Sequence, residues 1–266
     1  MKTLSNKAFE QVTQLFHSVS GIRLGPQKQA LVAGRLQRLA HEAGEPDVDT
    51  YVDKVVRGLT PSQEMVRVID RLTTNETFFF REPQHFNDLQ RRAKEAPADA
   101  PFELWSAASS SGEEAYSAAM VLAEVRGKRP WRITGTDLST AMVEAASRAL
   151  YPVERARMVP ADYLKRFCLK GQGKQEGSLL IGRELREHVR FLQANLMQDL
   201  PELPMFDVIF LRNVLIYFEN DAKGQIVRRV LGRLKPNGVL YIGHAESMSA
   251  LNLPIRSLGT AIYGHA

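Results

Sequence analysis

The spacing of apolar residues divides the chain into two parts. Up to about residue 72, apolar side chains recur every three or four positions, which is typical of amphipathic helices. From Phe102 onward, short apolar runs alternate with amphipathic stretches, which is typical of an α/β domain. We therefore predict a helical domain over residues 1–72, a linker over 73–101 and an α/β domain over 102–266.

The helical part contains start and stop signals. Ser5 is a suitable N-cap for a first helix, Gly21 ends that helix, and Pro26 can open a second one. A short third helix is predicted around Val52–Val56. The sequence Thr60-Pro61-Ser62-Gln63 predicts a capping box with proline at the first helical position, and therefore the start of a fourth helix.

The α/β part contains apolar runs that are typical of buried strands. These runs are Phe102–Ala108, Trp131–Asp137, Val189–Asn195, Phe206–Asn213 and Val239–Gly243. The stretch Asp221–Leu234 before the last run predicts a helix. Strands that alternate with helices in this way predict a doubly wound sheet.

Residues 159–188 interrupt the alternation. Two strand-like runs, Leu164–Leu169 and Ser178–Gly182, flank the glycine-rich stretch Gly171–Gly177. Glycine-rich turns between short apolar runs are typical of hairpins. We therefore predict a small antiparallel β insert, with the glycine-rich stretch at the tip of a hairpin.

Two features at predicted strand ends indicate a nucleoside site. The first strand runs into the small-residue turn Ser109–Gly112, and the second strand ends on Asp137. A doubly wound sheet holds adenosine-type ligands with such a turn and such an acid, and the acid accepts hydrogen bonds from the ribose hydroxyls. The turn has one glycine, so it is not a dinucleotide GxGxxG motif. As an alternative, Asp137 caps a helix that starts near Ser139.

Composition indicates an ordinary soluble protein with a slight basic excess. Apolar residues make up 44% and charged residues 24% of the 266 residues, the net charge is +5 and the pI is about 9.3. This charge leaves an acidic partner open, either nucleic acid or a carboxylate-rich protein. Cys168 is the single cysteine, which fits a reducing cytoplasm. The sequence has no signal core and no apolar run near the roughly 18 residues of a membrane span.

Several catalytic or metal-binding motifs are excluded by the sequence. The six histidines are dispersed and form no HExxH motif, so we predict no metal site. The triplet His244-Ala245-Glu246 imitates the HxE of a deaminase, but a single cysteine cannot supply the CxxC that this chemistry needs. Gly171–Lys174 is not followed by Ser or Thr, so it is not a P-loop.

Four segments together resemble one enzyme family. The segment Thr73–Glu82 combines polar groups with three consecutive phenylalanines, which is unusual for a linker. This segment, together with Trp105–Glu114, Phe206–Phe218 and Leu234–Ser247, resembles the signature motifs of the CheR-type chemoreceptor glutamate methyltransferases, in family order over nearly the whole chain. The chain departs from the family at Ser109-Ser110-Ser111, where Cys-Ser-Thr is usual; both triplets are small and polar.

The resemblance implies a fold, a cofactor and a set of site residues. The fold is a small all-helical N-terminal domain followed by a class I, Rossmann-like methyltransferase domain with a small antiparallel β insert. The cofactor is S-adenosylmethionine (SAM), and the catalytic pair falls on Arg81 and Tyr217. The implied cofactor contacts are Asn75, Thr77, Arg81, Glu113, Asp137, Asn195, Leu196, Arg212 and Asn213.

The resemblance also implies the partners. The enzyme is expected to be a cytoplasmic monomer that methylates glutamates on receptor helices, with no nucleic acid partner and no membrane insertion. For Arg35 and Arg38 on the second predicted helix, a solvated helix face is the default interpretation, and docking to the acidic methylation region is the alternative that the resemblance suggests. In some members a pentapeptide at the receptor C-terminus binds the β insert, where Lys170, Lys174 and Arg183 could pair with its acids.

The chemistry of the implied reaction fits these residues. A carboxylate is already a nucleophile at neutral pH and a sulfonium methyl group is already activated, so no general base is needed. An arginine can hold the carboxylate and a tyrosine hydroxyl can orient it. The alternatives are a methyltransferase for another protein, nucleic acid or a small molecule, or a non-catalytic cofactor-sensing adaptor. The Asn/Asp-Pro-Pro-aromatic motif of base methylation does not follow residues 206–213.

Overall fold

A computed structural model describes residues 4–249 and 251–266. Contacts divide the chain into two compact units. One unit contains the residues up to Thr74 together with Tyr217–Glu219, and the other contains Asn75–Ile216 and Asn220–Ala266. Among the described residues, no helix is both long and apolar enough to span a membrane.

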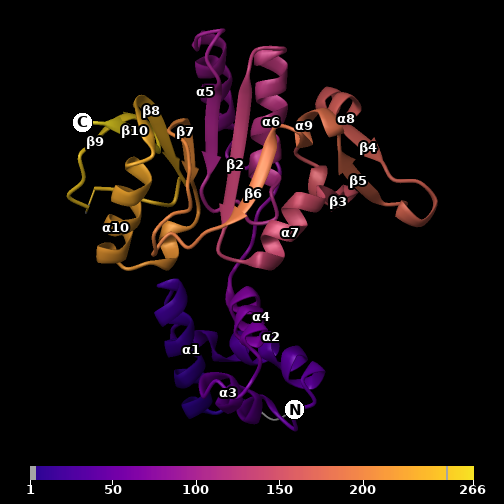
Figure 1. Cartoon of the computed structure of the whole chain (residues 1–266), viewed down its shortest axis with the longest axis vertical. Coiled ribbons are helices and arrows are strands. Elements are labelled where there is room, and N and C mark those ends of the chain that lie inside the picture. The colour runs from indigo at the N-terminus through magenta and orange to yellow at the C-terminus, as the bar shows by residue number, and fades with distance from the viewer. Residues whose placement is uncertain (1–3, 250) are drawn as a thin grey trace. The chain divides into compact units, whose positions relative to one another are not determined.

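The first unit is helical, as predicted. Its elements are α1 (Asn6–Ser20), η1 (Pro26–Lys28), α2 (Gln29–Glu42), α3 (Val48–Val56) and α4 (Ser62–Leu72) (Figure 1). Each helix turns its apolar face inward, and the fully buried side chains of this unit include Val12, Phe16, Leu36 and Tyr51. Burial of these faces holds helices that are individually too short to be stable.

The helix ends follow the predicted signals with one exception. Ser5 Oγ accepts a hydrogen bond from the Ala8 amide at 3.2 Å, and Gly21 adopts φ 74°, so both predicted caps of α1 are confirmed. The predicted capping box at Thr60 is wrong, because Pro61 itself occupies the N-cap position of α4 and no side chain there caps the helix. Pro61 is held in an extended conformation, so α4 begins at Ser62, one residue later than the pattern indicated.

Arg35 and Arg38 have different surroundings on α2. Arg35 Nη1 donates to the carbonyls of Leu72 and Thr73 at 2.8 and 3.1 Å, where it satisfies the C-terminal end of α4. Arg38 is exposed and pairs with Glu42 at 2.6 Å along the same helix. The guanidinium of Arg35 therefore stabilises the helical unit, whereas that of Arg38 faces solvent.

The second unit is built on a seven-stranded sheet of order β6-β2-β1-β7-β8-β10-β9 (Figure 1). Its strands are β1 (Phe102–Ser106), β2 (Trp131–Asp137), β6 (Val189–Gln193), β7 (Phe206–Leu211), β8 (Leu234–Ile242), β9 (Ile255–Gly259) and β10 (Ile262–His265). The first five strands in this order run parallel, whereas β10 is antiparallel to both β8 and β9. The chain leaves β1 toward β2 and β6, then returns to the other side with β7 and β8. This order confirms the predicted Rossmann-like fold.

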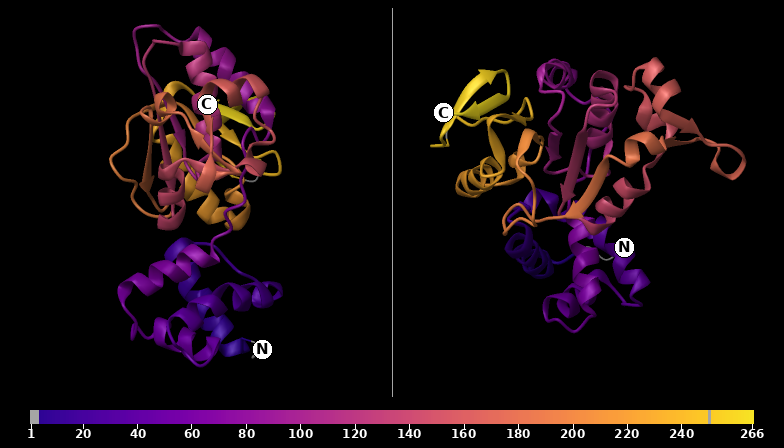
Figure 2. Two further views of the ribbon diagram at one scale, coloured as in Figure 1. Left: turned by 90° about the vertical axis from the view of Figure 1, so that its right-hand side faces the viewer. Right: turned by 45° about the horizontal axis from the view of Figure 1, so that its top comes forward.

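The helices of this unit are α5 (Pro83–Glu95), α6 (Glu113–Arg126), α7 (Thr140–Arg148) and α10 (Asn220–Leu231). Helix α5 lies beside α6 and contributes Phe86 and Leu89 to the main core (Figure 2). It occupies part of the stretch 73–101, which we had interpreted as a linker. The predicted helix 221–234 ends earlier, because β8 already begins at Leu234.

A second, three-stranded antiparallel sheet lies beyond one edge of the main sheet, opposite the C-terminal hairpin β9–β10 (Figure 2). Its order is β3-β5-β4, from β3 (Leu150–Pro152), β5 (Ser178–Ile181) and β4 (Cys168–Lys170), with η2 (Val153–Ala156), α8 (Ala161–Phe167), η3 (Gly173–Gln175) and α9 (Arg183–Arg186) around it. The hairpin β4–β5 around the glycine-rich stretch is confirmed. The run Leu164–Leu169 is mostly helix, and β3 precedes the predicted insert.

Candidate active site

The carboxyl ends of four parallel strands meet at one edge of the main sheet. Strands β6, β2, β1 and β7 are consecutive neighbours in the sheet. The sheet order reverses between β1 and β7, which is the position where doubly wound sheets bind ligands. The residues just beyond these four ends include most of the predicted cofactor contacts.

The turn after β1 has an unusual backbone. Ser110 and Gly112 both have left-handed conformations, with φ 49° and 94°. A Cβ at Gly112 would lie 2.8 Å from the Ala146 Cβ, so glycine is needed for both its dihedral angle and its close packing. The Ser109 amide donates to the Thr136 carbonyl at 2.8 Å, which fastens the turn to the end of β2.

Asp137 fixes the same turn from the end of β2. Its Oδ2 accepts from the Ser110 amide at 2.8 Å and its Oδ1 accepts from the Ser139 amide at 2.9 Å. The N-cap of α7 is Ser139, whose Oγ accepts from the Met142 amide, and Asp137 in turn binds the amide of this N-cap residue. These bonds orient the carboxylate at the strand end where ribose binding is predicted.

Two residues of the Thr73–Glu82 segment are tied to this edge. Ser110 Oγ donates to the Asn75 carbonyl at 3.0 Å. Arg155 Nη2 donates to the Thr77 carbonyl at 2.8 Å, and its Nε pairs with Glu113 at 2.9 Å. The structure therefore brings Asn75 and Thr77 to the turn that follows β1.

Glu113 is fully buried beneath the turn. Its carboxylate accepts from Ser111 Oγ at 2.7 Å in addition to the pair with Arg155. Burial raises its pKa, although Ser111 and Arg155 oppose this rise. The carboxylate has protein partners, so a direct cofactor contact by Glu113 stays a prediction.

The end of β6 places Asn195 and Leu196 next to Asp137. The Ala194 amide donates to the Asp137 carbonyl at 2.9 Å. Asn195 Oδ1 accepts from the Met197 amide at 2.9 Å, and the Leu196 carbonyl accepts from Arg229 at 2.6 Å. Both predicted residues thus lie on a chain turn that α10 also holds.

Arg212, just after β7, is buried and contacts several residues of the site. Only 1% of its side chain is exposed, and its guanidinium pairs with Glu82 at 3.2 Å and with Glu114 at 3.0 Å. It also donates to the Arg81 carbonyl. The rings of Phe86 and Phe210 lie 5.7 and 5.6 Å from its central carbon. The side chain therefore joins β7 to the segment that carries Arg81.

The two carboxylates beside Arg212 were missed by sequence reasoning. Burial raises the pKa of Glu114, while Arg212 and the Ser106 hydroxyl, at 2.6 Å, act against it. Burial acts in the same direction on Glu82, but Arg212, Asn213 and the His244 amide outweigh it and bring its pKa below the usual value. An acid beside a buried segment needs a cation, but the sequence does not show which residue provides it.

Asn213 and Arg81 are both joined to this network. Asn213 has a left-handed backbone, with φ 57°, and its Nδ2 donates to Glu82 Oε1 at 3.3 Å. Arg81 is partly exposed; its Nη1 donates to the Glu76 carbonyl at 3.2 Å and its guanidinium lies 5.5 Å from the centre of the Phe78 ring. Tyr217 ends η4 (Leu215–Tyr217), which follows β7 closely.

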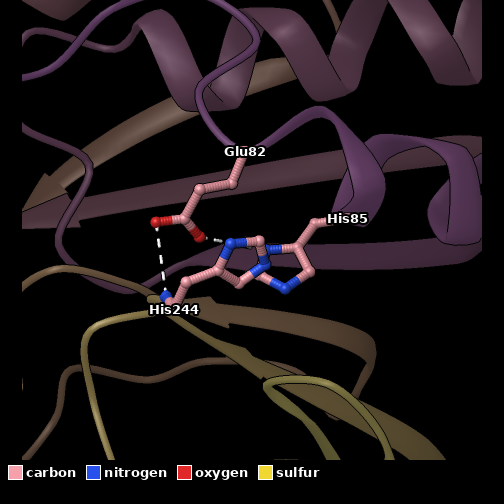
Figure 3. A group of neighbouring side chains, drawn as sticks. All are labelled: Glu82, His85 and His244. Carbon is pink, nitrogen blue, oxygen red and sulfur yellow. Dashed lines mark hydrogen bonds and ion pairs between the residues drawn. The ribbon is translucent and has the colours of Figure 1, made fainter.

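Two of the histidines that are dispersed in sequence come together in space. Glu82, His85 and His244 each have a possible ligand atom within 4.8 Å of the other two (Figure 3). Burial and the nearby Arg212 lower the pKa of His85 to about 4, so its ring is neutral at pH 7. Arg212 already provides a cation to Glu82, and a metal ion would have to displace it.

Comparison with known proteins identifies the family. Residues 75–263 match the SAM-binding domain of the CheR methyltransferases, and residues 7–73 match their all-alpha domain. The chain belongs to the CheR methyltransferase family. It is 35% identical over 263 residues to the chemotaxis protein methyltransferase of Escherichia coli K12, covering 98% of this chain and 91% of that protein.

Further relatives agree. Chemotaxis protein methyltransferase 2 of Pseudomonas aeruginosa is 35% identical over 267 residues, covering 97% of this chain and 92% of that protein. Chemotaxis protein methyltransferase 1 of Vibrio cholerae is 33% identical over 256 residues, with 94% and 92% covered. The CheR resemblance and the cofactor SAM are confirmed by these matches. The strand-end acid and the tight turn after β1 fit the adenosine part of SAM.

Replacement of Asp137 with asparagine should weaken binding of the product S-adenosylhomocysteine. The amide keeps the size of the side chain and one acceptor oxygen, but it loses the charge that strengthens hydrogen bonds from the ribose. We expect a loss of about 1–3 kcal/mol, measured by titration calorimetry. Asp162→Asn, at an exposed position on α8, is the matched control. Unchanged affinity in Asp137→Asn would remove this residue from the binding site.

Proposed function

We propose that this protein transfers the methyl group of SAM to glutamate side chains of chemoreceptors and so forms glutamate methyl esters. The observation that carries this proposal is the buried Arg212 network, which holds Arg81 and Asn213 beside the sheet edge where SAM binding is predicted. It is supported by relatives that are chemotaxis protein methyltransferases and that match nearly the whole chain.

The proposed reaction needs positioning more than acid–base chemistry. A glutamate oxygen attacks the sulfonium methyl carbon, the new C–O bond forms as the C–S bond breaks, and the sulfur leaves as a neutral thioether. Both reactants are already active at neutral pH, so the enzyme gains rate by aligning them. Holding the two reactants in line lowers the activation barrier by several kcal/mol.

Arg81 and Tyr217 are the proposed aligning residues. The guanidinium of Arg81 is partly exposed, so it can meet an incoming carboxylate. Its backbone carbonyl is held by Arg212, which fixes the segment without using the Arg81 side chain. Tyr217 would orient the same carboxylate through its hydroxyl.

Methyl transfer from labelled SAM to receptor-containing membranes tests the function. Label that enters receptor bands and is released by base as methanol indicates glutamate esters. Label in added nucleic acid, or base-stable label in another protein, would favour the alternative substrates. Binding of SAM without any transfer would favour a non-catalytic adaptor.

We also propose that the small sheet binds an aromatic and acidic receptor tail. Leu150 and Leu169 both pair in register with Leu180, so the three side chains form one row across a face of this sheet. Leu150 is 43% exposed and Leu169 is 59% exposed. An exposed apolar row beside an edge strand suits a peptide that adds as a further strand and places aromatic side chains on the row.

The charges around this row suit an acidic peptide. Lys170 on β4 and Lys174 in the hairpin loop are exposed. Arg183 is exposed as well, but it pairs with Glu187 at 2.6 Å, so its charge is already partly neutralised. The two lysines are therefore the better candidates for pairing with the acids of a tail.

A pentapeptide with aromatic and acidic residues should bind the intact enzyme with roughly micromolar affinity. Shortening the loop 171–177 should abolish this binding and leave SAM binding unchanged, because that loop lies outside the main sheet. Calorimetric titration measures both, and Leu169→Ser should weaken the peptide alone. Several receptor tails without detectable binding would indicate that this enzyme recognises the methylation helices only.

A further inference from the structure

Glu246 binds the backbone of two separate loops at the sheet edge. It follows β8, and its Oε2 accepts from the amides of Gly243 at 2.6 Å and Asn213 at 2.9 Å. Its Oε1 accepts from the amides of Leu215 at 2.7 Å and Ile216 at 3.3 Å. One carboxylate thus satisfies four main-chain donors.

Two of these donors, Asn213 and Gly243, lie just beyond the ends of strands, and the other two are the first amides of η4. Strand β7 stops at Leu211, and the left-handed Asn213 turns the chain out of the sheet. Amides in such a turn have no strand partner, and buried amides without an acceptor cost free energy. Between β7 and η4, the Glu246 carboxylate accepts the hydrogen bonds that a neighbouring strand would accept within the sheet.

A carboxylate suits this position better than other side chains. Both of its oxygens act only as acceptors, whereas a glutamine would direct its NH2 group at two of the four N–H donors. Gly243 is required for the approach, because a Cβ there would collide with the Asn213 amide nitrogen atoms and with Glu246 Oε2. The close contact of the two loops therefore depends on both Gly243 and Glu246.

We propose that Glu246 is a positioning residue for methyl transfer, which fixes the turn from Asn213 to Ile216 and thereby the start of the helix that ends on Tyr217. This inference rests on the proposed function. It assigns Glu246 no contact with substrate or cofactor; its effect passes through four backbone bonds. The sequence had marked Glu246 only as part of a false deaminase motif.

Glu246→Gln tests the proposal, because it keeps the shape and removes two of the four acceptor positions. We expect kcat for methyl transfer to fall about a hundredfold, the cost of a misplaced reactive group. The KM for the receptor and the affinity for S-adenosylhomocysteine should change less than about threefold, because the remaining site is intact. Glu202→Gln, an exposed carboxylate before β7, is the charge-matched control.

A double variant shows whether Glu246 acts through Tyr217. If it does, Glu246→Gln combined with Tyr217→Phe should be no slower than Tyr217→Phe alone. Multiplied losses would overturn the proposal, and so would full kcat in Glu246→Gln. If Glu246→Gln does not fold, Glu246→Asp, which keeps both oxygens one methylene further away, is assayed in the same way. Full turnover in Tyr217→Phe would instead refute the catalytic role of Tyr217, a separate failure.

Discussion

Arg212→Met is expected to lower the free energy of unfolding by about 3–5 kcal/mol, the usual cost of breaking a buried ion pair from one side. Methionine fills most of the space of the side chain but leaves Glu82 and Glu114 without their shared cation. It also removes the donor to the Arg81 carbonyl. Urea unfolding at pH 7, followed by circular dichroism, measures the loss.

The control for this prediction is Arg183→Met. That side chain is 83% exposed and pairs only with an exposed glutamate, so the change should stay within about 1 kcal/mol. Arg212→Met combined with Glu114→Gln should recover part of the stability, because one unpaired charge is gone. A loss in Arg212→Met no larger than in the control would show that the network is not a buried charge cluster.

The loss in free energy of unfolding caused by Arg212→Met should become smaller at low pH. Without the cation, burial raises the folded-state pKa of Glu114 further above the unfolded value of about 4.5, and Glu82 loses the charge that does most to lower its pKa. Folding then takes up protons, so the penalty is present above the raised pKa and disappears as the pH falls toward 4.5. In the wild type the lowered pKa of Glu82 stabilises the fold at neutral pH. This stabilisation is lost as the pH falls through the folded-state pKa of Glu82. Both effects bring the two proteins closer together at low pH.

Tyr217→Phe is expected to lower methyl transfer at least about a hundredfold, while S-adenosylhomocysteine affinity stays within about twofold. The substitution removes only the hydroxyl that we propose to orient the substrate carboxylate. Arg81→Ala should lose transfer to a similar degree, and its stability should be retained because Arg212 binds the Arg81 carbonyl, which alanine keeps. Single-turnover methylation of receptor membranes, with parallel calorimetry, measures both quantities.

Tyr263→Phe on β10 serves as the matched control and should keep full activity. Wild-type turnover in Tyr217→Phe would remove the hydroxyl from the mechanism. If Arg81→Ala lost both transfer and cofactor affinity in proportion, its main role would be to bind SAM rather than to hold the glutamate.

Local signals predicted the elements whose cause is local. The caps at Ser5 and Gly21 and the long apolar runs of β1, β2 and β7 are confirmed. The misses depend on distant partners. Strand β3 has only three residues and exists because it pairs with β5, and α5 is so rich in polar residues that its buried face is apparent only against α6. The hairpin of β9 and β10 was missed although its two strands pair locally; only its pairing with β8 depends on a distant partner.

The site shows the same division. Asp137 could be predicted because its position at a strand end is visible in the sequence. The partners of Arg212 could not, since Glu114 and Arg81 lie 98 and 131 positions away in the chain. Sequence motifs marked Arg212 as a cofactor contact, which stays a prediction, and they did not show that its guanidinium also pairs with Glu82 and Glu114. The role of a residue within a motif depends on contacts that only the folded chain supplies.

The hold of Glu246 on the turn after β7 has a consequence for how such enzymes diverge. All four of its partners are main-chain amides, and every residue except proline supplies one. The more exposed side chains of Val214 and Ile216 can therefore be exchanged during evolution without loss of these bonds. The path of the loop is fixed instead by Glu246 and Gly243, which lie outside the loop, so selection to keep this path acts on these two residues. A family can in this way vary the surface offered to different substrates while the loop that carries it keeps one course.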